Sequence, residues 1–119
     1  WLRGGGSDSA WYRASWQIDA GVDPKAAARP AHVMLNWLAQ QGLLNSNGTK
    51  AFVAVHEARD LSISRSMVDS KVAAFLDHTW ESWWQLYGIN LLLSENQTEA
   101  ATAAIAESWS TYGLKKAGQ

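Results

Sequence analysis

Apolar side chains in the second half of the chain recur at the spacing of an amphipathic helix. From residue 66 onward they follow one another at steps of four, four, three, one and three residues, and polar side chains occupy the opposite side. At about 100° per residue these apolar positions fall within an arc of roughly 120°. We expect one long helix over residues 66–87, which Gly88 ends. Its apolar stripe consists of Val72, Leu76, Trp80, Trp83, Trp84 and Tyr87.

A second segment, residues 30–41, is apolar on nearly every side. A helix of this kind usually lies at the centre of its fold. Because proline disfavours a helix interior, we expect this helix to begin at Pro30, with residues 24–29 forming a short turn or a separate piece. Gly42 is expected to end it, since glycine is the residue most often found just past a helix C-terminus.

Weaker patterns predict the remaining elements. Residues 45–48, Asn-Ser-Asn-Gly, are typical of a turn, and a helix over about 49–59 and a short connection at 60–64 follow. Residues 94–97 have the form of a capping box and open a last, alanine-rich helix that Gly113 ends. The apolar stripe of this helix consists of Ala101, Ile105, Trp109 and Tyr112.

These elements predict an all-α fold, a compact bundle of four to five helices. The 119 residues of the chain correspond to the length of a single domain. We expect a flexible lead-in over residues 1–10, one helical domain over 11–114 and a polar tail over 115–119.

The composition excludes several classes of function. The chain has no cysteine, which excludes disulfides, cysteine-bound zinc and thiol catalysis and fits a cytoplasmic location. The net charge of −1 gives no overall attraction for phosphate backbones, so we expect no nucleic-acid partner. No apolar run approaches the roughly 18 residues needed to span a membrane. A glycine-rich loop between a strand and a helix is also missing, and we expect no cofactor.

Three histidines are candidates for chemistry. The segment from His56 to Asp60 begins like the zinc-protease pattern His-Glu-x-x-His, with Asp60 in place of the second histidine. A metal-dependent enzyme that uses His56, Asp60 and His78 is therefore one hypothesis. The favoured interpretation is a surface histidine among solvated charges, with no metal and no catalysis. His32 lies on an apolar side of its helix and is expected to be a core histidine; with Trp37 it is also a candidate for a pocket.

The tryptophans either form part of the core or present a surface on which a ligand can bind. Trp80, Trp83 and Trp84 continue an apolar stripe, which favours core, although a presented aromatic surface stays an alternative. Trp11, Tyr12 and Trp16 lie in a segment without a steady period. Such aromatic side chains either cover the core or contact a partner, because tryptophan and tyrosine are enriched at interface hot spots. These three are the candidate partner-binding residues.

Residues 12–44 carry a family resemblance. An Ala-Ser-Trp segment, a proline-containing loop, a helix with histidine and tryptophan, and a Gly-Leu-Leu exit follow one another in order; the residues are Ala14, Ser15, Trp16, Pro24, His32, Trp37, Gly42, Leu43 and Leu44. This order resembles a bacterial family of unknown function whose small members look like immunity proteins, which neutralise a toxin by binding it. The chain departs from the family in being nearly neutral and in having Tyr12 and Arg13 where aspartates are expected.

The resemblance implies a bacterial, non-catalytic protein-binding module of the immunity type, with a toxin-like protein as its partner. The alternative hypothesis is a small-molecule or carbohydrate binder. Its pocket would be lined by Trp16, Trp37 and some of the tryptophans between residues 80 and 84.

Overall fold

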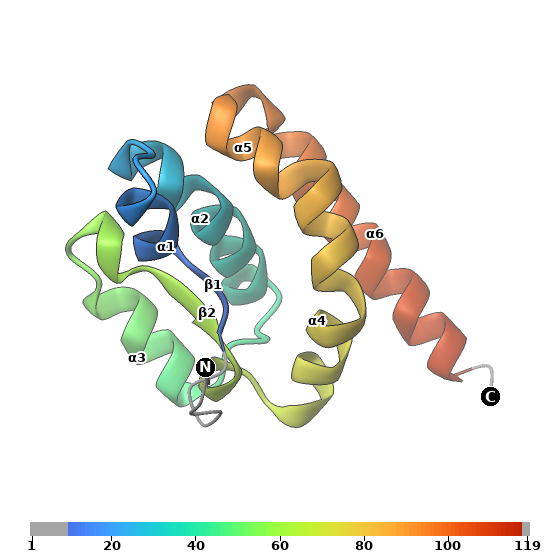
Figure 1. Cartoon of the computed structure of the whole chain (residues 1–119). Coiled ribbons are helices and arrows are strands. Elements are labelled where there is room, and N and C mark those ends of the chain that lie inside the picture. Colours follow the sequence, from blue (N-terminus) through green and yellow to red (C-terminus); the bar gives the residue numbers. More distant parts are fainter. Residues whose placement is uncertain (1–9, 118–119) are drawn as a thin grey trace, which may run out of the picture.

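The computed structural model describes residues 10–117 of the chain, and the side chains as far as residue 113. Apart from two short strands, this part of the chain is an all-α bundle, as the periodicity predicts (Figure 1). The lead-in expected over residues 1–10 lies outside the described residues, except for Ala10. The helices are α1 (Ala14–Asp19), α2 (Pro24–Gln40), α3 (Ser46–Ala54), α4 (Ser70–Trp83), α5 (Ile89–Leu93) and α6 (Thr98–Ala117).

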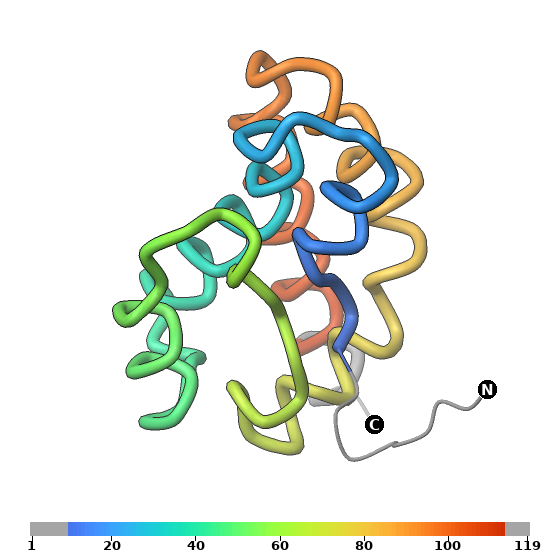
Figure 2. The backbone as a smooth tube through the Cα atoms, turned by 60° about the vertical axis from the view of Figure 1, so that its left-hand side comes forward, coloured from blue at the N-terminus to red at the C-terminus, as the bar shows by residue number. Residues whose placement is uncertain are grey.

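Helix α2 lies at the centre of the bundle. It packs against α1 and against both α5 and α6, and α4 packs against α6 (Figure 2). Most of its side chains are buried, as expected of a helix that is apolar on nearly every side. Among the described residues, no helix is long and apolar enough to cross a membrane.

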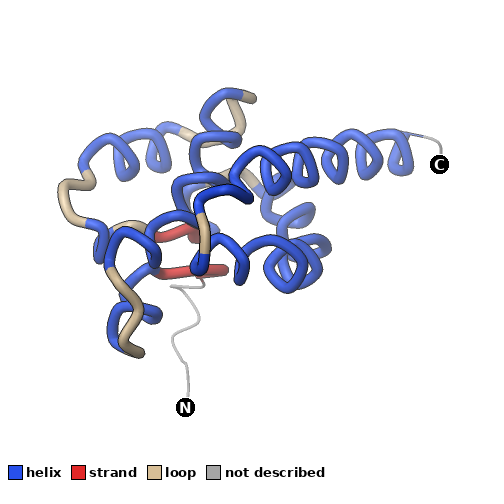
Figure 3. The backbone as a smooth tube through the Cα atoms, turned by 90° about the horizontal axis from the view of Figure 1, so that it is seen from above, coloured by secondary structure: helices blue, strands red, loops and turns tan. Residues whose placement is uncertain are grey.

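Two strands that the sequence pattern did not predict pair at one side of the bundle (Figure 3). β1 (Ala10–Arg13) and β2 (Ser62–Ser64) are antiparallel, and Tyr12 lies opposite Ile63. Both of these side chains are buried, whereas the serines on either side of Ile63 are half-buried. The connection expected over residues 60–64 is therefore partly a strand, because Ile63 pairs with the buried tyrosine.

Helix α2 passes through Pro30, so the expected start at this residue is wrong. The helix begins at Pro24, where the Asp23 side chain accepts a hydrogen bond from the Lys25 N–H at 3.0 Å. An internal proline removes one backbone hydrogen bond and crowds the preceding turn. Here the proline ring is itself buried, and the Tyr12 hydroxyl donates to the Ala27 carbonyl at 2.6 Å within that turn. Core packing on both sides of Pro30 keeps the helix continuous.

The predicted 66–87 helix begins later and ends later than expected. Asp69 caps α4 by accepting from the Val72 N–H at 3.1 Å. Gly88 does not end the helix: the π-helical segment η4 (Trp84–Gly88) leads directly into α5. A Cβ atom at Gly88 would lie 2.3 Å from Cε3 of Trp84. This glycine is needed for the close approach of the Trp84 ring.

Three other expected boundaries are wrong. The Asn45 side chain accepts from the Gly48 N–H at 2.7 Å, so Asn-Ser-Asn-Gly forms the cap and first turn of α3 instead of a loop. That helix ends at Ala54, short of the expected residue 59. Helix α6 continues past Gly113 to Ala117 and takes in part of the expected tail.

The aromatic core consists of two clusters. In the first, the Tyr12 ring lies 5.1 Å from Trp84 and 6.3 Å from Trp80. Trp83, whose indole N–H donates to the Ala101 carbonyl at 3.0 Å, packs against Trp80. Trp80 and Trp83 are buried, so these two rings belong to the core and are not presented to a ligand. The second cluster consists of Trp37, Phe75, Trp109 and Tyr112.

Candidate functional site

Tyr12 is not a partner contact, and this part of the expected binding segment is wrong. Its side chain is 2% exposed and lies beneath Trp16 and Trp84. Burial raises the pKa of its phenol above the usual range, because the charged form would lose its hydration. The hydroxyl is used within the fold, as a donor to α2.

Trp11 and Trp16 have different environments. The Trp11 ring is half-buried; its indole N–H donates to Oδ1 of Asp77 at 3.1 Å, and the Arg65 guanidinium lies 5.1 Å from the ring centre. Arg65 also pairs with Asp77, so Trp11 links β1 to α4. Trp16, by contrast, is 50% exposed and meets Tyr12 edge-on at 6.4 Å. Of the three predicted contacts, Trp16 is the most exposed to solvent.

A second apolar surface lies on η4 and α5. Leu86, Ile89 and Leu93 are 64%, 42% and 79% exposed, and their spacing of three and four residues places them along one helix face. We call these three residues the exposed apolar stripe. The opposite side of α5 faces the core through Leu91, which is fully buried. This stripe does not follow from the sequence pattern when the helix is expected to end at Gly88.

The segment that contains the exposed apolar stripe carries acidic side chains and no lysine or arginine. Residues 72–113, which include α4 after its first turn, α5 and most of α6, contain no lysine or arginine. Their acidic side chains are all exposed. From another element, Arg29 of α2 reaches this region and donates to the Leu91 carbonyl at 2.7 Å. The acidic residues are Asp77, Glu81, Glu95, Glu99 and Glu107.

His32 and Trp37 lie on one pocket between α2 and the start of α6, which we call the α2–α6 pocket. His32 is exposed, and its ring lies 6.3 Å from that of Phe52, so the expected core histidine is wrong. The pocket has a volume of about 320 Å³. It is lined by two rows of α2 side chains at i, i+4 spacing and by two threonines of α6: Arg29, Val33 and Trp37; His32, Asn36 and Gln40; Thr98 and Thr102.

Trp37 is 3% exposed, and its indole nitrogen has no hydrogen-bond partner among the described residues. A buried donor without a partner costs about 1–3 kcal/mol. The ring packs near Phe75 and Trp109, in the second aromatic cluster. The aromatic rings that the alternative hypothesis expects in one pocket do not share the α2–α6 pocket: Trp37 is the only tryptophan among its lining residues, and its side chain is 3% exposed.

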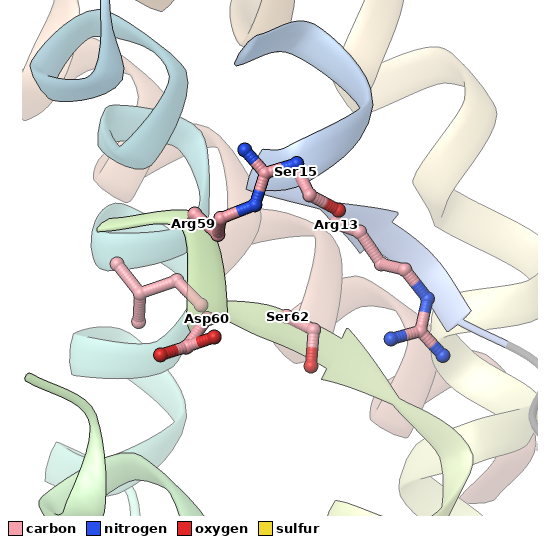
Figure 4. Close-up of a pocket in the computed structure, with 6 residues that line it drawn as sticks. Arg13, Ser15, Arg59, Asp60 and Ser62 are labelled. Atoms are coloured by element: carbon pink, nitrogen blue, oxygen red, sulfur yellow. The ribbon is translucent and has the colours of Figure 1, made fainter. Parts of the chain in front are cut away.

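Another pocket lies where β1 and α1 meet η2 (Ala58–Asp60) and β2 (Figure 4). It contains two guanidinium groups, which could in principle hold an anion. Figure 4 shows them on different sides of the pocket, pointing away from each other. Arg59 pairs with Asp19 at 2.6 Å, and this hydrogen bond raises the pKa of its guanidinium. The two arginines therefore do not converge on one ligand. The lining residues are Arg13, Ser15, Arg59, Asp60, Leu61 and Ser62.

The residues of the metal hypothesis are separated. The chain leaves α3 at Ala54, so His56 lies in a loop and Asp60 in the short η2 helix, and the expected common helix face does not form. His78 lies on α4, where its ring centre is 5.7 Å from that of Tyr112 and the side chain lines a different pocket. Within residues 10–117 no group of three potential metal ligands is present.

No protein-family model, curated protein or solved structure matches the chain. Function is therefore inferred from two features of the molecule, the exposed apolar stripe and the α2–α6 pocket.

Proposed function

We propose that the protein is a non-catalytic protein-binding module that contacts its partner through the exposed apolar stripe. The observation that supports this function is the exposure of Leu86, Ile89 and Leu93 on one helix face. Large apolar side chains gathered on a surface mark interaction sites. Anchors at i, i+3 and i+7 are also the pattern by which a helix binds in an apolar groove of another protein.

The burial of these three side chains supplies a substantial part of a binding energy. Complete burial of a leucine or isoleucine side chain contributes about 1.5–3 kcal/mol. Scaled by the exposed fractions, the stripe offers about 3–5 kcal/mol of apolar burial. The adjoining π-helical segment η4 supports the same assignment, since such segments occur frequently at functional sites.

The charge pattern indicates the kind of partner. Exposed carboxylates on both sides of the stripe, such as Glu81 and Glu95, fit a groove with a basic rim. Complementary charge of this kind accelerates association and makes the rate depend on salt. A toxin-like protein with such a groove is the partner that the immunity-type resemblance favours, and the exposed Trp16 is a candidate second contact.

The test compares the double variant L86Q/L93Q with V53Q. Val53, on α3, is 76% exposed and lies outside the stripe. V53Q therefore replaces an exposed apolar side chain elsewhere on the surface and serves as the control. Partners are captured from the source cell with the wild-type protein, identified, purified and titrated. We expect L86Q/L93Q to weaken binding about 30-fold or more and V53Q to leave it unchanged.

A toxin-expression assay separates the general proposal from the immunity type. Protection by the wild type but not by L86Q/L93Q supports both the stripe as the contact surface and the immunity type. Recovery of no toxin-like partner, together with no protection, refutes the immunity type. Equal effects of V53Q and L86Q/L93Q on Kd refute the stripe as the contact surface.

A further inference from the structure

We infer that the α2–α6 pocket binds a small hydroxycarboxylate, a ligand with one carboxylate and at least one hydroxyl group. This site uses residues other than the exposed apolar stripe and does not depend on the proposed function. Its volume of about 320 Å³ lies at the lower end of the range for ligand sites, roughly 300–1,000 Å³, and suits a small molecule.

The α2 wall of the pocket supplies hydrogen-bond donors and a positive charge. Arg29 carries a guanidinium with five N–H donors, and its Nη1 donates to the Leu91 carbonyl at 2.7 Å. That bond fixes the group and leaves other N–H donors for a ligand. The Asn36 and Gln40 amides lie one and two turns beyond His32 on the same wall, and no aspartate or glutamate lines the pocket. A wall of donors around a guanidinium matches a carboxylate.

The α6 wall supplies acceptors. The Thr98 hydroxyl donates to the Glu95 carbonyl at 2.9 Å, and the Thr102 hydroxyl donates to the Thr98 carbonyl at 2.9 Å. Each hydroxyl has a single proton, so both oxygens can only accept a further hydrogen bond. A ligand that satisfies them must bring an O–H or N–H donor. Sulfate, chloride and simple alkyl carboxylates lack this donor, whereas a hydroxycarboxylate has both groups.

Trp37 provides a probe of the pocket. Its indole N–H belongs to a pocket-lining side chain, is buried and has no hydrogen-bond partner among the described residues. The same N–H gives a specific signal by which binding can be followed.

The probe is glycerate, and the controls are glycerol, which lacks the carboxylate, and propionate, which lacks the hydroxyls. The assigned Trp37 indole resonance is followed by ¹H–¹⁵N NMR during each titration. We expect a saturable shift with glycerate in the millimolar range and at least fivefold weaker binding of both controls. Glycerate at ten times its Kd should also raise Tm by about 5 °C.

Two neighbouring glutamines give a matched pair of variants. Gln40 and Gln41 are both exposed, but only Gln40 lines the pocket. We expect Q40A to weaken glycerate binding about tenfold, as for loss of a hydrogen bond to a charged group, and Q41A to leave it unchanged. The inference is overturned if glycerate gives no saturable shift up to about 50 mM, if glycerol or propionate binds equally well, or if Q41A weakens binding as much as Q40A.

Discussion

Gly88→Ala tests how closely the Trp84 ring packs on the helix at the π-helical segment. The backbone at Gly88 is helical, with φ of −60°, so alanine causes no backbone strain there. The new Cβ would however lie 2.3 Å from Cε3 and 3.0 Å from Cδ2 and Cζ3 of the Trp84 ring. Because the indole ring is rigid, it can relieve this overlap only by moving as a whole.

Two opposing contributions decide the outcome. Alanine forms helix better than glycine by about 1 kcal/mol. Overpacking a core typically costs about 1–3 kcal/mol, and sometimes more. Displacing Trp84 also weakens its contacts with Tyr12 at 5.1 Å and Trp80 at 5.9 Å, each worth about 0.5–1.5 kcal/mol. We expect a net destabilisation of about 1–3 kcal/mol, which lowers Tm by roughly 5–15 °C.

Gly113→Ala is the matched control. Gly113 is exposed within α6, and a Cβ there meets nothing within 4 Å. Only the helix propensity changes, so G113A should stabilise the protein by about 0.5–1 kcal/mol. Urea unfolding followed by circular dichroism at 222 nm measures both variants. Stabilisation by G88A equal to that by G113A would show that the Trp84 ring does not lie over Gly88. Adding W84L should relieve the overlap and reduce the cost of G88A.

Two further predictions concern the aromatic N-terminal segment. A phenol whose pKa is higher in the folded than in the unfolded state adds stability below about pH 10 and loses it as the pH rises further. The free energy of unfolding should therefore fall above pH 10. In Y12F this fall should be smaller, and the loss of the hydrogen bond to the Ala27 carbonyl should destabilise the protein by about 1–2 kcal/mol at pH 7. An unchanged pH dependence of stability in Y12F would contradict the burial of the phenol. Acrylamide should quench Trp16 readily and Trp83 hardly at all, so that W16F removes much of the accessible fluorescence; equal quenching of both would contradict their different exposures.

Helices were predictable where one face repeats its apolar residues, and their ends were predictable where a local feature decides them. Gly42 ends α2 as expected because its φ of 70° is a conformation that glycine adopts readily. Gly88 and Gly113 look the same in the sequence but lie within helices. Their difference from Gly42 depends on tertiary packing, in particular on where the Trp84 ring lies. Pro30 was misjudged for the same reason, since its helix is held together by the core.

The strand pair and the candidate sites depend on longer-range contacts. β1 pairs with a segment about fifty residues away, and Ser62, Ile63 and Ser64 are too few to show a period. His32 and Trp37, the candidates for a pocket, both line the α2–α6 pocket. The sequence of a helix that is apolar on nearly every side does not show which of the two side chains is exposed. The positions of α3 and α6 decide this.

The exposed apolar stripe shows how an error in one boundary conceals a proposed contact surface. With the helix ending at Gly88, the apolar run at residues 89–93 has no defined faces, and its burial cannot be assigned. Once the helix continues, Leu91 faces the core and Ile89 and Leu93 fall on the opposite side with Leu86. The small size of Gly88 permits the close approach of the Trp84 ring, and the helix continues beyond this residue into the stripe. A substitution at Gly88 that displaces Trp84 is therefore expected to disturb both the core and the helix that carries the proposed contact surface.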